Sequence, residues 1–266
     1  MVRLVGMALG LVFCFVLAWA FLVPREATQP DPVKLLHREP KEVSWPHTGP
    51  FGKFDRAQLQ RGFQVYKEVC SSCHGLYHVH YRDLEKIGFT PAQVKAIAAE
   101  YEVPAIDPNT GETITRPALP TDKFYRPFPN EQAARAANNN AYPPDLSLII
   151  KARKNGESYV YSLLTGYGEE PPPGFEVPDG LNYNPYFHSV NIAMAQPLVD
   201  GQVEYADGTP ATVDQMAKDV VAFLRWAAEP ELEVRRRVGL ASLLFLSILA
   251  VLSYLTYRRV WADVKP

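Results

Sequence analysis

The sequence predicts a mostly α-helical protein in which one soluble domain lies between two apolar helices. The segments Leu4–Val23 and Val238–Tyr257 each contain 20 residues without a charged side chain, and about 20 apolar residues cross a bilayer as a helix. Between them, apolar residues recur at helical spacing in several segments. The chain has 24 prolines, which cluster between Pro104 and Pro197 and predict long irregular loops there.

Residues 1–24 are predicted to form an uncleaved N-terminal anchor, with a signal peptide as the alternative. Arg3 before an apolar stretch is typical of a signal peptide, and Ala18-Trp19-Ala20 offers a small-x-small cleavage pattern. However, Trp19 is bulky for such a site. The apolar stretch also continues to Val23, beyond the 7–15 residues usual in a signal peptide, so we favour the anchor.

Residues 25–235 are predicted to form the soluble domain, whose first helix begins at the N-cap residue Asp55. Its apolar face is marked by Leu59, Phe63 and Tyr66, and the helix delivers Cys70 at its C-terminal end. The net charge is only −2, so the chain has no excess of basic residues that would indicate binding to nucleic acid.

A second helix is predicted over Thr90–Glu100, with Thr90 as cap and Pro91 at the first helical position. Residues 107–111, Asp-Pro-Asn-Thr-Gly, predict a turn, and Glu112–Thr115 then closes a small hairpin. Two further helices are expected over Pro144–Lys154 and Ser158–Thr165. The four prolines among residues 169–179 predict a loop.

The last soluble helix is predicted over Val213–Ala228, where Thr212 and Gln215 have the spacing of a capping box. Pro230 separates it from residues 236–266, the predicted C-terminal membrane anchor and short tail. Tyr257, Arg258, Arg259 and Trp261 end the apolar segment, and such residues are typical of a membrane interface.

The residues that carry the chemistry are Cys70-Ser71-Ser72-Cys73-His74, a Cys-x-x-Cys-His sequence. This spacing is typical of covalent attachment of one c-type haem through two thioethers, with the histidine as proximal iron ligand. A zinc site would need a second pair of ligands, and the only other cysteine is Cys14. A thioredoxin-like dithiol should lie near a βαβ pattern, which is not found here. With helices before the motif and at the end of the domain, we expect a class I cytochrome c-like fold.

Methionine and histidine are the usual candidates for a sixth iron ligand. Met194 is the only methionine in a soluble loop, and its small neighbours let the backbone approach a flat ring. We therefore favour Met194, with His188 as the rival. Arg153 is a candidate partner for a haem propionate, because a guanidinium pairs bidentately with a carboxylate. A solvated helix charge explains Arg153 equally well.

Beyond the haem motif, several segments resemble the cytochrome c1 family, the c-type haem subunits of cytochrome bc1 complexes (ubiquinol–cytochrome c reductases), here of bacterial type. These segments are Arg135-Ala136-Ala137-Asn138-Asn139, Pro143-Pro144-Asp145-Leu146-Ser147, Ser162-Leu163-Leu164-Thr165-Gly166-Tyr167, Asn184-Pro185-Tyr186-Phe187 and Phe223-Leu224-Arg225-Trp226-Ala227-Ala228-Glu229-Pro230. Some family members have a cysteine after the Gly-Tyr pair, where this chain has Gly168, so that disulfide is excluded.

The resemblance implies that Met194 is the axial ligand, Arg153 the propionate partner, Tyr159 a haem contact and Pro144 part of the haem-edge wall. It also implies an electron carrier without acid–base catalysis inside a quinol–cytochrome c reductase. The implied partners are cytochrome b, a Rieske iron–sulfur protein, a cytochrome c acceptor and the lipid membrane, in a dimeric complex of respiratory or photosynthetic electron transport.

Covalent haem attachment in such families takes place outside the bacterial cytoplasm. The resemblance therefore implies an inner-membrane protein with its haem domain in the periplasm and both termini inside. Three other interpretations stay open at the level of sequence: a haem subunit of an oxidase, a thiol oxidoreductase or zinc module without haem, and a gas sensor or peroxidase with an open sixth site.

Overall fold

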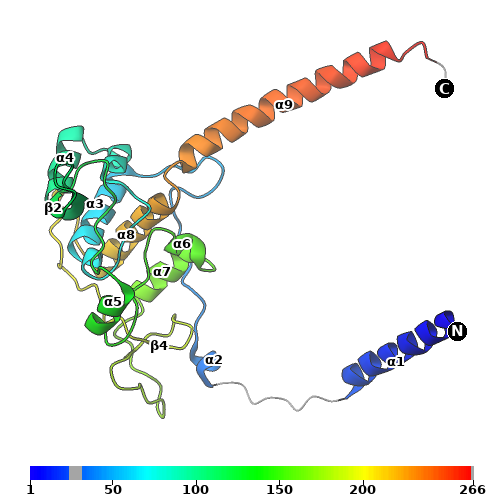
Figure 1. The fold of residues 1–266 in the computed structure, drawn as a ribbon, viewed down its shortest axis with the longest axis horizontal. Helices are drawn as coiled ribbons and strands as arrows, with labels where there is room; N and C mark the ends of the chain where they lie inside the picture. The colour runs from blue at the N-terminus through cyan, green and yellow to red at the C-terminus, as the bar shows by residue number, and fades with distance from the viewer. Residues whose placement is uncertain (24–31, 265–266) are drawn as a thin grey trace. The chain divides into compact units, whose positions relative to one another are not determined.

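The computed structural model describes residues 1–23 and 32–264 and divides the chain into two compact units, Met1–Leu36 and His37–Pro266. The first unit contains α1 (Val2–Leu22) and the short helix α2 (Pro32–Leu36) (Figure 1). α1 is long and apolar enough to cross a membrane. The predicted boundary between residues 24 and 25 lies outside the described residues, as does the end of the tail at 265–266.

The second unit is built on the crossing of α3 (Arg56–Glu68) and α8 (Val213–Ala228) (Figure 1). α3 begins where its sequence predicts, because the Asp55 carboxylate accepts hydrogen bonds from the backbone N–H groups of Ala57 and Gln58. The backbones are in contact at Gly62, where a Cβ atom would lie 2.0 Å from the carbonyl oxygen of Asp219. Only glycine allows so close an approach.

Aromatic side chains fill the core around this crossing. The Phe63 and Tyr66 rings of α3 each lie with their centroids 5.8 Å from that of Phe223, and Phe223 stacks on Trp226 at 5.6 Å. All four are buried. Such offset and edge contacts add to the stability gained by burial, so this cluster fixes α3, and the motif that follows it, against α8.

The capping pattern differs from the prediction at α8. Thr212 accepts from the Gln215 N–H at 3.2 Å, but the Gln215 side-chain amide donates to Asp219 instead of closing the box. Asp219 is fully buried beside Arg61, and this buried carboxylate recruits the amide. A complete capping box is found instead on α4 (Pro91–Ala99), between Thr90 and Gln93.

Two small antiparallel sheets and three short helices surround the core. The predicted hairpin is present as β1 (Glu102–Ile106) and β2 (Thr113–Pro117), with Glu102 opposite Pro117. The second sheet pairs β3 (Asn182–Tyr183) with β4 (Asn191–Ile192). In the second unit the sequence analysis missed this sheet and three helices, which are η1 (Cys70–Ser72), η2 (Tyr81–Ile87) and α5 (Glu131–Ala137).

The helix predicted over Pro144–Lys154 is wrong for most of its length, since α6 covers only Ile149–Ala152. The Asp145 carboxylate accepts from the N–H groups of Tyr77 and Ser147, and these bonds hold the segment in a non-helical loop. Asn155 then adopts a left-handed conformation (φ 53°) that separates α6 from α7 (Gly156–Leu164). α7 therefore begins before the predicted Ser158, and the loop over 169–179 is confirmed.

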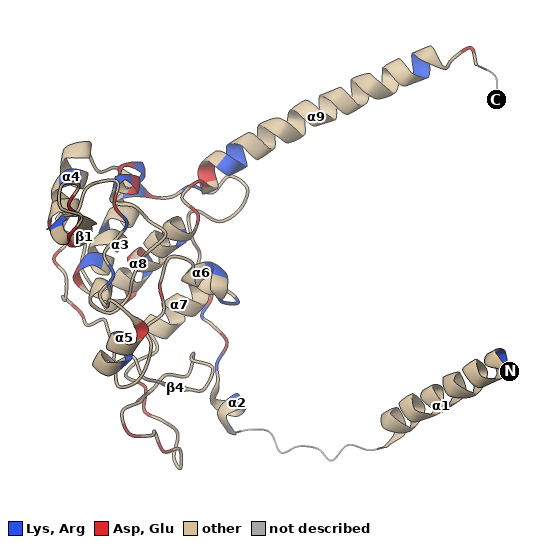
Figure 2. Cartoon of the chain, in the orientation of Figure 1, with Lys and Arg blue, Asp and Glu red and all other residues tan. Residues whose placement is uncertain are grey.

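The chain ends in α9 (Leu232–Val260), 29 residues long and apolar enough to cross a membrane. Charged residues lie only near its two ends (Figure 2). α1 and α9 are the two candidate membrane helices among the described residues. The prediction of a mostly helical domain with apolar helices at both ends is confirmed.

Candidate functional site

The Cys-x-x-Cys-His residues follow α3 directly and are held in a single helical turn, η1. The N–H of Cys73 donates to the carbonyl of Cys70 at 3.2 Å, and the N–H of His74 donates to the same carbonyl at 2.9 Å. This turn places both cysteines and the imidazole within one compact segment. The packing of α3 on α8 therefore also fixes the position of the motif.

The imidazole of His74 has one nitrogen committed to the protein. Its Nδ1 lies 2.8 Å from the carbonyl oxygen of Pro144, which can only accept, so Nδ1 carries the proton. Nε2 is then the nitrogen with a free lone pair, as a metal ligand requires. Burial lowers the pKa of His74, which favours the neutral imidazole needed for ligation.

The thiol of Cys70 is unsuited to act as a free nucleophile. Burial raises its pKa to about 12, and the neighbouring Cys73 adds to the shift. A redox dithiol depends on a lowered cysteine pKa. A zinc site also lacks support, because no group of three or more His, Cys, Asp or Glu side chains forms a metal cluster within residues 1–23 and 32–264. The raised thiol pKa argues against a redox dithiol at Cys70.

Residues 144–146 are held against the motif by hydrogen bonds made by the two residues that follow Pro144. The N–H of Leu146 donates to the carbonyl of Gly75 at 2.9 Å, and the Asp145 carboxylate accepts from the Tyr77 N–H at 2.9 Å. A Cβ atom on residue 75 would lie 3.0 Å from that carboxylate. Pro144 is thus held beside His74; its place in a haem-edge wall stays a prediction.

A cavity of about 350 Å³ opens next to Cys73, and its wall includes Tyr77, Arg126 and Pro143. The cations of Lys123 and Arg126 each lie 3.6 Å from the centroid of the Tyr77 ring. Lys123 and Arg126 together lower the pKa of the Tyr77 phenol, Lys123 chiefly by a hydrogen bond. This pair of cations on the Tyr77 ring was not predicted, because no spacing in the sequence connects residue 77 with residues 123–126.

Met194 lies in the loop after β4 and is half-buried. Two side chains hold its backbone: the Tyr167 hydroxyl donates to the Met194 carbonyl at 2.9 Å, and the Asn182 amide donates to it at 3.3 Å. Burial raises the pKa of Tyr167, so its hydroxyl stays protonated as a donor. Sequence reasoning missed both roles. Tyr167 lies in one of the segments that resemble the cytochrome c1 family, residues 162–167, whereas nothing in the sequence singled out Asn182.

Arg153 follows α6 directly and lies within hydrogen-bonding reach of Tyr159 in α7. Burial raises the pKa of Tyr159, and the charge of Arg153 together with a hydrogen bond from it opposes that shift. The guanidinium also donates to the Ala152 carbonyl at 3.1 Å and is exposed, so it remains free to pair with an anion. Tyr159 in turn acts electrostatically on Tyr167, which connects this pair to the Met194 loop.

The structure thus forms two groups from the predicted residues. Cys70, Cys73, His74 and Pro144 form one, and Arg153, Tyr159 and the Met194 loop form the other. His188, the rival ligand, is exposed, and its ring packs against that of Phe187 at 4.4 Å. The assignment of Met194 as sixth ligand stays a prediction.

Comparison with known proteins finds close relatives over most of the chain. Residues 45–264 match the model of the cytochrome C1 family. The chain is 51% identical over 222 residues to the mitochondrial cytochrome c1 haem protein of Saccharomyces cerevisiae, covering 84% of this chain and 72% of that protein. It is 53% identical to cytochrome c1-2 of Solanum tuberosum (83% and 85%). It is also 48% identical to the cytochrome b/c1 protein of Bradyrhizobium diazoefficiens (85% and 36%).

Proposed function

We propose that this chain, which belongs to the cytochrome c1 family, carries single electrons from a Rieske iron–sulfur protein to a cytochrome c acceptor during quinol oxidation. Its cofactor is haem c, and it is an electron-transport protein of the cytochrome bc1 complex. The observation that best supports the proposed site is the His74 Nδ1 contact with Pro144, beside two cysteines at haem-attachment spacing.

In this proposal Cys70 and Cys73 would hold the haem through thioethers, and His74 and Met194 would be the protein ligands of its iron. Arg153 pairs with a propionate, while Tyr159 and Pro144 contribute to the wall. The bound haem supplies a one-electron iron couple, whose potential is raised by methionine ligation. The residues fit this group because His74 presents a neutral, oriented imidazole and Arg153 an exposed cation.

The chain's own contribution is to position and shield. Pro144 fixes the orientation of the His74 ring, and hydrogen bonds from Tyr167 and Asn182 fix the position of the Met194 backbone. No side chain has to donate or remove a proton in a one-electron relay. The protein's role is therefore binding, orientation and electrostatics, and the chain itself is a carrier within a larger enzyme.

The relatives are named as cytochrome b-c1 complex and cytochrome b/c1 proteins, which supports a cytochrome b partner for this chain. We place the haem domain in the periplasm of a bacterial inner membrane, with α1 and α9 as anchors and both termini inside. We also propose that the complex is dimeric, as the family resemblance implies. The two apolar helices support membrane association.

The test compares wild type with Met194→Leu in the membrane-purified complex, by pyridine haemochrome spectra and redox titration. We expect two thioether links in both proteins and a large fall in reduction potential in the variant only. His188→Leu is the matched control and is expected to leave the potential unchanged. A spectrum and potential indifferent to Met194→Leu would reassign the sixth ligand, and a protein without haem would overturn the proposal.

A further inference from the structure

Residues 46–53, named here the interface loop, connect two buried aromatic residues, Trp45 and Phe54. Near the end of the loop the Phe51 side chain is 77% exposed. Leaving a large aromatic ring in water forgoes the free energy that its burial would release. A single exposed ring does not by itself require a partner, but the residues around the loop indicate which partner it would suit.

The loop is well ordered by its own backbone. The N–H of Thr48 donates to the Trp45 carbonyl at 3.1 Å, and the N–H of Lys53 donates to the Pro46 carbonyl at 3.2 Å. Gly52 is required, because a Cβ atom there would lie 2.0 Å from the carbonyl oxygen of Thr48. Phe51 is thus presented on a turn that backbone hydrogen bonds close.

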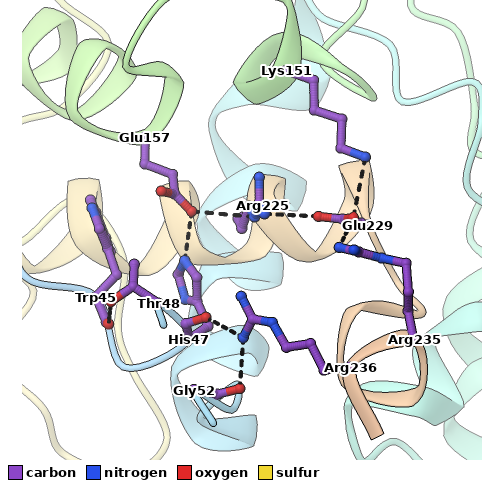
Figure 3. Close-up of polar contacts among 10 residues, drawn as sticks. All are labelled: Trp45, His47, Thr48, Gly52, Lys151, Glu157, Arg225, Glu229, Arg235 and Arg236. Carbon is purple, nitrogen blue, oxygen red and sulfur yellow. Dashed lines mark hydrogen bonds and ion pairs between the residues drawn. The ribbon is translucent and has the colours of Figure 1, made fainter. Parts of the chain in front are cut away.

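The interface loop is fastened to the first two turns of α9. The Arg236 guanidinium donates to the carbonyls of His47 at 2.7 Å and Gly52 at 2.9 Å (Figure 3). One turn earlier, Glu233 accepts from the N–H of Phe54 at 2.8 Å. The backbone next to Phe51 therefore lies at the level of Arg236 on the helix.

That level is the start of the apolar span. Val238 begins the charge-free segment two residues after Arg236, which is about 3 Å further along a helix axis. The interface loop lies beside the base of α9 (Figure 1), where its charged residues give way to apolar ones (Figure 2). Aromatic residues are enriched at this depth in membrane proteins.

Charge complementarity points to the same partner. Lys53 and Arg237 flank this region and are exposed, and neither has an ion pair within the part of the chain that the structure describes. Basic residues next to a membrane span attract anionic lipid headgroups. One exposed basic side chain in the loop and one at the start of the span therefore suit a lipid surface with anionic headgroups.

We propose that the interface loop is a second membrane contact, in which Phe51 inserts into the headgroup region and Lys53 and Arg237 bind anionic headgroups. This contact would set the height and tilt of the domain above the bilayer. It depends on α9 spanning the membrane and is independent of the haem and its electron transfer.

The test places a nitroxide label at residue 51 by Phe51→Cys, with Cys14→Ser, in the full chain reconstituted into nanodiscs containing phosphatidylglycerol. Accessibility to oxygen, which enters lipid, is compared with accessibility to a water-soluble nickel chelate. Ile106→Cys is the matched control, because Ile106 is 72% exposed in β1. Leu246→Cys reports whether α9 itself lies in lipid.

We expect the oxygen-to-nickel ratio at residue 51 to exceed that at residue 106 several-fold. Equal ratios at 51 and 106, with a lipid-like ratio at 246, would overturn the proposal and leave the span intact. A label at 51 that is shielded from both reagents in the complete complex would assign the site to a protein subunit instead.

In Lys53→Gln/Arg237→Gln, replacing phosphatidylglycerol by phosphatidylcholine should no longer change the depth of the label. A wild-type depth insensitive to that exchange would overturn the headgroup contact.

Discussion

The two sides of the candidate haem site end in the same interaction but are built differently. The Tyr66 hydroxyl donates to the His74 carbonyl at 3.1 Å, and the Tyr167 hydroxyl donates to the Met194 carbonyl at 2.9 Å. Tyr66 stands 8 residues from His74, at the end of α3, whereas Tyr167 stands 27 residues from Met194. The histidine side is thus made by local helical structure, and the methionine side by contacts between distant loops.

This difference predicts which side of the site opens first. His74 is adjacent to a cysteine that we propose is bonded covalently to the haem, and its segment follows a helix packed in the core. Met194 would be held by its iron bond and by hydrogen bonds from Tyr167 and Asn182. Regions with few buried apolar contacts open at lower free energy than core helices. Loss of the sixth ligand should therefore precede global unfolding.

The largest effect on the free energy of unfolding is expected from Gly62→Ala, which disrupts the packing of α3, the helix before His74, on α8. The new methyl would collide with the Asp219 carbonyl and push α3 away from α8. Overpacking of a core typically costs about 1–3 kcal/mol, and a backbone collision belongs at or above the upper end. The measurement is guanidinium unfolding of the purified haem protein, followed by its absorbance.

Gly239→Ala is the matched control, since no atom lies within 4 Å of the position of its Cβ. It is expected to leave the free energy of unfolding of the domain unchanged. Equal stability of the two variants would contradict the close crossing of α3 and α8.

A smaller effect, confined to ligation, is expected from Tyr167→Phe. Removing this hydroxyl costs about 1 kcal/mol, which corresponds to about a fivefold rise in the population with Met194 dissociated. The measurement is the rate and extent of carbon monoxide binding to the reduced protein, since carbon monoxide needs a free sixth position. An unchanged carbon monoxide reaction would show that the hydrogen bond does not hold the ligand.

Tyr66→Phe provides the paired comparison, because it deletes the same group on the histidine side. The loss of global stability should again be about 1 kcal/mol, but carbon monoxide binding should remain at the wild-type level. If both variants opened the sixth position equally, the proposed asymmetry between local and long-range construction would be wrong.

The same asymmetry explains what the sequence could predict. The start of α3 at Asp55, α8 and the haem motif were predictable because caps, periodicity and motif spacing act within a few residues. The part played by Asn182 was not, because the position of its partner, the Met194 carbonyl, depends on how the loop after β4 folds. The prediction of a helix over Pro144–Lys154 failed for the same reason. The Asp145 carboxylate accepts a hydrogen bond from the distant N–H of Tyr77, which local helix propensity does not predict.

The smallest effect is a pH dependence that should appear on the histidine side alone. Residues 118–124 run beside residues 79–82, and Asp122 in this strap forms two hydrogen bonds with Arg116, at 2.6 and 3.0 Å. The hydrogen bond from Arg116, assisted by the Leu119 N–H, lowers the pKa of Asp122 in the folded chain.

Because the folded pKa of Asp122 is the lower one, its ion pair stabilises the protein above the unfolded pKa of about 3.9 and loses that contribution as the pH falls through the folded value. The pair is partly exposed, so Asp122→Asn should cost only about 0.2–1 kcal/mol at pH 7. The difference from wild type should shrink as the pH falls below 4.

Urea unfolding between pH 3 and 7 measures this, and carbon monoxide binding over the same range should not differ between the two proteins. A pH-dependent difference in carbon monoxide binding would show that the strap is coupled to Met194, and the two sides could then no longer be treated as independent.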